Sequence, residues 1–142
     1  MYRILIIEDE HDTAGPVKEA LEMYGYGADI AENGAVGVEM FRKKEYDLVL
    51  LDLKMPQMNG EEALKKIRET DPYVYVIVYT NYSDFGDIKT MTNLGIDGYV
   101  NKGPGADLKE LINMIQDKLD PLDSREVKIL LDGLPDLPKK EG

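Results

Sequence analysis

Reactive side chains follow four of the apolar runs in this sequence. The run RILII is followed by three acids, VLL by an aspartate, VYVIVY by a threonine and DGYV, one residue later, by a lysine. These residues are Glu8, Asp9, Glu10, Asp52, Thr80 and Lys102. Taken singly, each is as well explained by a helix cap or a turn.

Taken together, these residue types are suited to phosphoryl transfer. Carboxylates that lie close together repel one another and favour a bound divalent cation, and ligands that are all oxygen select a hard ion, above all Mg²⁺. The cation and an ammonium group would neutralise phosphoryl oxygens, a hydroxyl would donate a hydrogen bond, and an aspartate would be the nucleophile. The pattern therefore predicts phosphorylation of an aspartate.

Such a site requires elements that bring the strand ends together. Short apolar runs predict strands at Arg3–Ile7, Gly27–Ala31, Asp47–Leu51, Val74–Tyr79 and Asp97–Val100. Amphipathic segments predict helices near residues 13–24, 34–44, 60–69, 85–94 and 106–119. This alternation predicts an α/β fold, a doubly wound five-stranded parallel sheet with helices on both faces. In such sheets ligands bind beyond the carboxyl ends of the strands, where the reactive residues are expected.

Two details of the elements bear on this prediction. Pro16 is compatible with the first helix if Asp12 or Thr13 caps it, because N–H groups of the first turn have no helical partner to lose. Gly60 is expected to begin the third helix or to supply a positive φ angle.

The chain resembles the receiver domain of bacterial two-component response regulators, in particular the single-domain, chemotaxis-regulator-like kind. The residues that carry the resemblance are Glu8-Asp9, Asp52 within DLKMPQMNG, Thr80, Tyr99 and Lys102, and the match extends over residues 1–119. The resemblance implies a flavodoxin-like sheet of strand order 2-1-3-4-5. It also implies that a histidine kinase or a phosphotransfer protein is the phosphodonor of Asp52.

The resemblance further implies a role for each site residue. Mg²⁺ would be held by Glu8, Asp9, Asp52 and the backbone carbonyl of Lys54. Lys102 would pair with the phosphate, Thr80 would be the switch hydroxyl and Tyr99 the switch aromatic. These two residues would relay phosphorylation to the face formed by residues 85–94, 97–100 and 106–119, where a downstream protein effector binds.

Composition excludes other classes of protein. The sequence contains no cysteine, which excludes disulfides and thiolate chemistry. A formal net charge of −11 disfavours direct binding to nucleic acid. No targeting or membrane-spanning segment is apparent, so a cytoplasmic location without membrane attachment is expected.

Residues 120–142 differ in character and are interpreted as a tail. A short amphipathic helix is expected near 124–132, followed by a disordered end. With no output domain apparent, the chain is expected to act as a single-domain response regulator that signals by binding other proteins.

Two alternatives to this function remain. A receiver-like adaptor that works without phosphate stays open because Asn81 after the threonine and Gly103-Pro104-Gly105 after the lysine depart from the usual family pattern. The intact acidic pair, Asp52, Thr80 and Lys102 argue against it. An aspartyl-phosphate phosphatase is less favoured, because that class has a second aspartate two residues after the nucleophile, where this chain has Lys54. The leading interpretation is not an enzyme; it is limited to self-catalysed phosphotransfer and autodephosphorylation.

Overall fold

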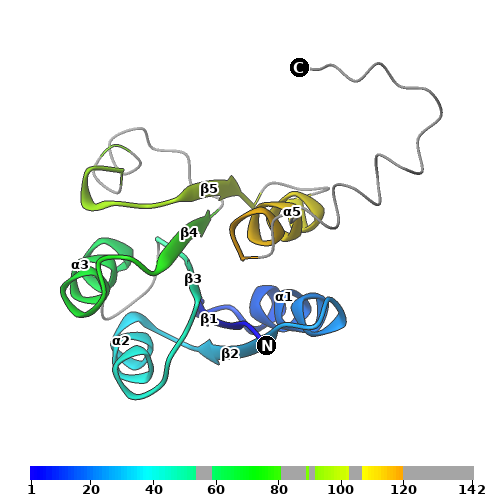
Figure 1. Ribbon diagram of the computed structural model, residues 1–142, viewed down its shortest axis with the longest axis horizontal. Helices are drawn as coiled ribbons and strands as arrows, with labels where there is room; N and C mark the ends of the chain where they lie inside the picture. Colours follow the sequence, from blue (N-terminus) through cyan, green and yellow to red (C-terminus); the bar gives the residue numbers. More distant parts are fainter. Residues whose placement is uncertain (54–58, 81–88, 90–91, 103–106, 120–142) are drawn as a thin grey trace, which may run out of the picture.

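A single parallel sheet organises the computed structural model, which describes residues 1–53, 59–80, 89, 92–102 and 107–119. Its five strands lie in the order β2-β1-β3-β4-β5 (Figure 1). They are β1 (Arg3–Ile7), β2 (Gly27–Ala31), β3 (Leu48–Leu51), β4 (Tyr75–Thr80) and β5 (Gly98–Asn101). Every neighbouring pair is parallel. The predicted fold and strand order are confirmed, and each strand lies within one residue of its predicted limits.

Helices pack against both faces of this sheet (Figure 1). They are α1 (His11–Met23), α2 (Gly34–Lys43), α3 (Gly60–Thr70) and α5 (Asp107–Leu119). The helix predicted near 85–94 falls largely outside the described residues, within which residues 89 and 92–94 are helical. The tail from residue 120 also lies outside them. None of the helices in the described ranges combines the length and the apolar character needed to cross a membrane.

The core consists of two apolar layers, because alternate residues of a strand point to opposite faces of the sheet. Leu5 and Ile7 of β1 lie in the layer shared with α2 and α3. Ile4 and Ile6 lie in the layer shared with α1 and α5. The same alternation predicts which face of the sheet the side chain directly after each strand points to, and it therefore orients the reactive residues.

Helix α1 begins earlier than the sequence indicated. Glu10 is the N-cap residue, and its carbonyl accepts hydrogen bonds from the N–H groups of Thr13 (3.1 Å) and Ala14 (2.9 Å). The prediction that Asp12 or Thr13 caps the helix is wrong, and Pro16 lies inside α1 rather than in its first turn. The helix continues because Pro16 removes a single N–H donor while the apolar face of α1 stays buried.

Helices α1 and α5 both end at the edge of the sheet where the strands start. Leu119, the last residue of α5, is buried in the same apolar cluster as Leu21 of α1 and Tyr26, which directly precedes β2. This edge is opposite to the one that carries Asp52, because Asp52 follows the carboxyl end of β3.

Polar contacts also stabilise the start of β5 at this edge of the sheet, where the strands begin. Arg68, at the end of α3, donates to the carbonyl oxygens of Val74 (2.6 Å) and Gly95 (2.9 Å) and forms an ion pair with Asp97 (3.3 Å). Asp97 also accepts a hydrogen bond of 2.8 Å from the N–H group of Val76 in β4. The segment that enters β5 is thus fixed to β4 and α3, and β5 leads directly to Lys102.

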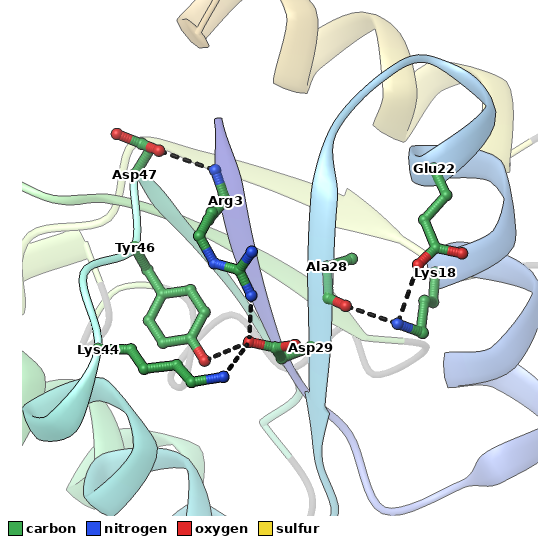
Figure 2. Close-up of polar contacts among 8 residues, drawn as sticks. All are labelled: Arg3, Lys18, Glu22, Ala28, Asp29, Lys44, Tyr46 and Asp47. Carbon is green, nitrogen blue, oxygen red and sulfur yellow. Dashed lines mark hydrogen bonds and ion pairs between the residues drawn. The ribbon is translucent and has the colours of Figure 1, made fainter. Parts of the chain in front are cut away.

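A second polar cluster joins β1, β2 and the segment before β3 (Figure 2). The Asp29 Oδ2 atom accepts hydrogen bonds from the Tyr46 hydroxyl at 2.6 Å and from Arg3 at 2.9 Å, and Lys44 lies 3.5 Å away. Burial alone would raise the pKa of Asp29, but the hydrogen bonds from Tyr46 and Arg3 outweigh it and hold the pKa below its ordinary value. The cluster therefore stabilises the fold while Asp29 is ionised.

We expect an Asp29→Asn variant to lower the free energy of unfolding at pH 7 by about 1 kcal/mol, because two hydrogen bonds to a carboxylate are weakened. The folded pKa of Asp29 lies below the unfolded value near 3.8. Its contribution is therefore complete above that pH and is lost as the pH falls through the folded pKa. Urea unfolding at pH 7 and at low pH measures this loss. Glu45→Gln, an exposed change nearby, is the control; an equal loss in both variants would contradict the prediction.

Candidate functional site

Three carboxylates meet at the carboxyl edge of the sheet. Backbone hydrogen bonds of 3.0 Å, from Glu8 N–H to Ala31 and from Asp52 N–H to Ile7, continue the sheet one residue beyond the strands. Carboxylate oxygens of Glu8, Asp9 and Asp52 lie within 4.8 Å of one another. Glu8 and Asp52 are 4% and 6% exposed, so two of these charges are withdrawn from water.

Lys102 completes the group from the end of β5. Its Nζ atom lies 2.5 Å from Glu8 Oε1 and 3.6 Å from Asp52 Oδ2, and its side chain is 8% exposed. The lysine therefore pairs most closely with Glu8 and also reaches Asp52. Among the described residues, one ammonium faces three carboxylates, so this part of the site has an excess of negative charge.

Burial shapes the electrostatics of this group. It raises the pKa of Glu8 to about 7; the hydrogen bond from Lys102 opposes this rise, and the charge of Asp52 adds to it. Burial alone would lower the pKa of Lys102, but the hydrogen bond to Glu8 and the charges of Asp52 and Glu8 raise it overall. The group thus keeps Lys102 protonated beside a Glu8 carboxylate that is costly to ionise.

The donor set fits a hard divalent cation. The oxygens of Glu8, Asp9 and Asp52 are close enough to share one ion, and oxygen ligands of this kind suit Mg²⁺. Burial is the main cause of the raised pKa of Glu8, and a bound divalent cation would offset the charge of Asp52 that adds to this rise. The backbone N–H of Glu10 donates to the other oxygen of Glu8 at 3.2 Å, which orients that carboxylate.

Asp52 and Leu53 lie close to the start of α3. Asn59 caps α3 by accepting a 2.9 Å hydrogen bond from Glu62 N–H, and Gly60 N–H donates to the Leu53 carbonyl at 3.1 Å. A Cβ atom at Gly60 would lie 2.7 Å from Leu53 Cα and 2.8 Å from the Asp52 carbonyl oxygen. Gly60 begins α3 as predicted but has no positive φ angle. The close approach of backbone atoms explains the glycine.

We expect a Gly60→Ala variant to lower the free energy of unfolding by about 2 kcal/mol, because the new methyl group meets backbone atoms that cannot move aside. Gly15→Ala is the matched control, since a Cβ atom there has no neighbour within 4 Å inside helix α1. That change should leave stability the same or raise it by about 0.5 kcal/mol. Urea unfolding compares the two variants, and equal values would remove the steric explanation of Gly60.

The structure brings together Glu8, Asp9, Asp52 and Lys102 as the sequence predicted. Thr80 ends β4, with its backbone opposite Asn101 of β5. Tyr99 is half-buried on β5 and packs against the apolar layer of α2 and α3. The remaining predicted residues, Lys54, Asn81 and Gly103-Pro104-Gly105, lie outside the described residues. The roles assigned to all these residues stay predictions.

Sequence reasoning missed Tyr79 as a neighbour of this group. The Nζ atom of Lys102 lies 5.6 Å from the centroid of the Tyr79 ring. The signal that could have found it is alternation, since Tyr79 follows Ile77 by two residues on the face that Asp52 also shares. A strand tyrosine directly before Thr80 looked like ordinary sheet composition.

Comparisons with known proteins match most of the chain to one family. The family model for the response regulator receiver domain matches residues 4–116. The chain is 35% identical over 157 residues to response regulator ArlR of Staphylococcus saprophyticus, covering 99% of this chain and 69% of ArlR. It is 34% identical over 100 residues to chemotaxis protein CheY of Halobacterium salinarum, covering 70% of this chain and 83% of CheY.

A solved structure shares the fold and about a third of the aligned sequence. Response regulator TrrA of Thermotoga maritima, in complex with Mg(2+)-BeF, aligns with a TM-score of 0.75 at 34% identity, covering 84% of this chain and all of that one. Some relatives are longer: the chain spans 43% of YkoG of Bacillus subtilis and 47% of DltR of Streptococcus agalactiae, both named as transcriptional regulatory proteins.

Proposed function

The chain belongs to the family of response regulator receiver domains, and from this premise we propose that it accepts a phosphoryl group on Asp52 with Mg²⁺ and signals through phosphorylation-dependent binding to other proteins. One observation carries the proposal. Asp52 shares its space with Glu8 and Asp9, and the ammonium of Lys102 lies 3.6 Å from its carboxylate.

The proposed reaction is a substitution at phosphorus. An Asp52 oxygen attacks the phosphoryl group of the donor, a phosphohistidine or an acyl phosphate, and forms a new P–O bond. The bond from phosphorus to the donor breaks, and the donor leaves with the electron pair. Lys102 offers its positive charge to the phosphoryl oxygens. Because Asp52 is 6% exposed, most water is kept from the reacting carboxylate.

The carboxylates of Glu8, Asp9 and Asp52 would hold Mg²⁺, together with the carbonyl of Lys54, which lies outside the described residues. When bound, Mg²⁺ supplies charge neutralisation for the phosphoryl oxygens. A Mg(2+)-BeF complex among the similar structures supports this assignment. The repulsion between carboxylates that the cation relieves gives the binding its driving force.

The transmitted change is proposed to run through Thr80 and Tyr99. Thr80 ends the strand next to β5, and Tyr99 lies half-buried on β5 itself, where it packs against the core. A phosphoryl group adds about two negative charges and strong acceptors beside these strand ends. The effector would then bind the face made by β5, α5 and the segment before β5. A histidine kinase or a phosphotransfer protein would donate the phosphoryl group in the cytoplasm.

Intact mass spectrometry of the wild-type protein tests this function. After incubation with acetyl phosphate and Mg²⁺, we expect the mass to rise by one phosphoryl group, and we expect no rise when Mg²⁺ is chelated. Borohydride reduction of the acyl phosphate followed by peptide sequencing should locate the modification at Asp52. No rise at any Mg²⁺ concentration would favour the adaptor that works without phosphate. Rapid turnover of added phosphate esters would favour the phosphatase.

A further inference from the structure

The side chains at the carboxyl edge are ordered by the register of the sheet. Ile7 is opposite Leu51, and Leu51 is opposite Val78, so the next residues, Glu8, Asp52 and Tyr79, form one row across the strands. Tyr79 is in turn opposite Val100 of β5. Tyr79 therefore separates the strand that carries Asp52 from the strand that leads to Lys102.

Alternation places this row on the face of α1 and α5. Val100 is buried in that apolar layer, and Tyr79 packs against it. Lys102 follows Val100 by two residues and has the same orientation. To reach Asp52, the Lys102 side chain must extend from β5 past Tyr79 toward β3. Its Nζ atom then lies 5.6 Å from the centre of the Tyr79 ring. This distance is within the range of a cation–π interaction.

We propose that Tyr79 is a positioning residue for Lys102, and that its ring holds the ammonium beside Asp52 when Glu8 turns to a bound cation. The proposal rests on the proposed function of Asp52. Glu8 is the partner closest to Lys102, at 2.5 Å, and it is also one of the carboxylates suited to Mg²⁺. An ion shared with Glu8 neutralises that carboxylate and weakens its attraction for the lysine.

The ring of Tyr79 has the property that the carboxylates lack. It attracts an ammonium through its quadrupole and carries no charge for a metal ion to neutralise. The attraction is strengthened because the Lys102 side chain is 8% exposed and little water competes. Lys102 thus keeps the Tyr79 ring as a neighbour whether or not the carboxylates bind a metal ion. A tyrosine that merely fills the edge of the core would not affect the lysine in this way.

Nuclear magnetic resonance tests the geometry without any phosphoryl transfer. Protons held over the face of an aromatic ring resonate upfield, so the ε-methylene protons of Lys102 should be shifted upfield in the wild-type protein. We expect this shift to persist when Mg²⁺ is added, to remain in Tyr79→Phe and to disappear in Tyr79→Leu. A Lys102 signal at the ordinary lysine position in wild type, or its return to that position with Mg²⁺, would overturn the proposal.

Kinetics test the consequence for the site. With acetyl phosphate and Mg²⁺, Tyr79→Leu should be phosphorylated about fivefold more slowly than wild type, and Tyr79→Phe should recover most of that loss. In a Lys102→Met background, Tyr79→Leu should have no further effect, because the interaction that it removes is already absent. Tyr75→Leu, the same change earlier on β4, is the control for altered packing of the strand.

Each outcome decides for or against the positioning role. Equal rates for the Phe and Leu variants, or an undiminished loss in the Lys102→Met background, would reduce Tyr79 to a packing residue. Urea unfolding of each variant identifies any loss of rate that comes from loss of fold. If wild type accepts no phosphoryl group, the proposed function fails, and the Lys102 chemical shift still decides whether the ring holds the lysine.

Discussion

An Asp52→Asn variant is expected to accept no detectable phosphoryl group from acetyl phosphate and Mg²⁺. The amide is a far weaker nucleophile than a carboxylate, and the neighbouring acids are poorly placed to substitute for it. Glu8 is held by Lys102 and by the N–H of Glu10. Intact mass of variant and wild type, incubated in parallel, measures the loss.

The same variant should remain folded, which separates loss of chemistry from loss of structure. Removing one of three crowded carboxylates relieves repulsion, so without Mg²⁺ we expect the free energy of unfolding to stay the same or rise by about 1 kcal/mol. Asp12→Asn, an exposed acid in the first turn of α1, is the control and should be phosphorylated normally. Undiminished phosphorylation of Asp52→Asn would assign the acceptor to another carboxylate.

A Lys102→Met variant is expected to slow phosphorylation about a hundredfold, comparable to the loss of one charge-stabilising donor in an enzyme site. Methionine keeps much of the length of the side chain but removes the ammonium that lies 3.6 Å from Asp52. The rate of the mass increase measures this effect. A rate within twofold of wild type would show that Lys102 takes no part in the transfer.

The same variant should bind Mg²⁺ more tightly, by about tenfold, because the ammonium no longer competes with the cation for Glu8 and Asp52. Without Mg²⁺ it should be less stable by about 3 kcal/mol, since two buried carboxylates lose their cationic partner. Thermal unfolding over a range of Mg²⁺ concentrations measures both effects. Lys109→Met, on the exposed side of α5, is the control and should change neither property.

The sheet was predictable because most of its strands are short, largely apolar runs separated by amphipathic segments. Its nearly continuous hydrophobicity reflects burial on both faces, as the two layers on either side of Ile6 and Ile7 illustrate. The convergence of Glu8, Asp52 and Lys102 followed from parallel strands whose carboxyl ends share an edge. The strand order itself came from family resemblance and not from the runs.

The start of α1 was misplaced because two local signals favoured a later first turn than the backbone forms. Asp12 and Thr13 are good caps, and Pro16 favours the first turn, so a later start looked better. In the structure the carbonyl of Glu10 accepts hydrogen bonds from the N–H groups of Thr13 and Ala14, so the helix already begins at His11. Capping preferences and helix propensity are weak guides to the exact end of a helix.

Contacts between residues distant in sequence could not be predicted from the sequence pattern. The position of Tyr79 beside Lys102 depends on the register of β4 and β5. The need for glycine at position 60 depends on how closely the backbones at Asp52 and Leu53 approach α3. These distances cannot be read from the composition of either segment alone. The sequence therefore indicated only that Tyr79 belongs to a strand and that Gly60 begins a helix.

The edge at which α5 ends has a consequence for any module that is covalently linked after it. Leu119 lies with Tyr26 at the starting edge of the strands, whereas Asp52 lies at the other edge. A module attached there would be tethered roughly 15 Å or more from the phosphoryl group, the length of a strand of about five residues. The part of the linker nearest to α5 would then be too far away to contact the phosphate. Such a module would have to sense phosphorylation indirectly, through a change in the surface of the domain that it contacts.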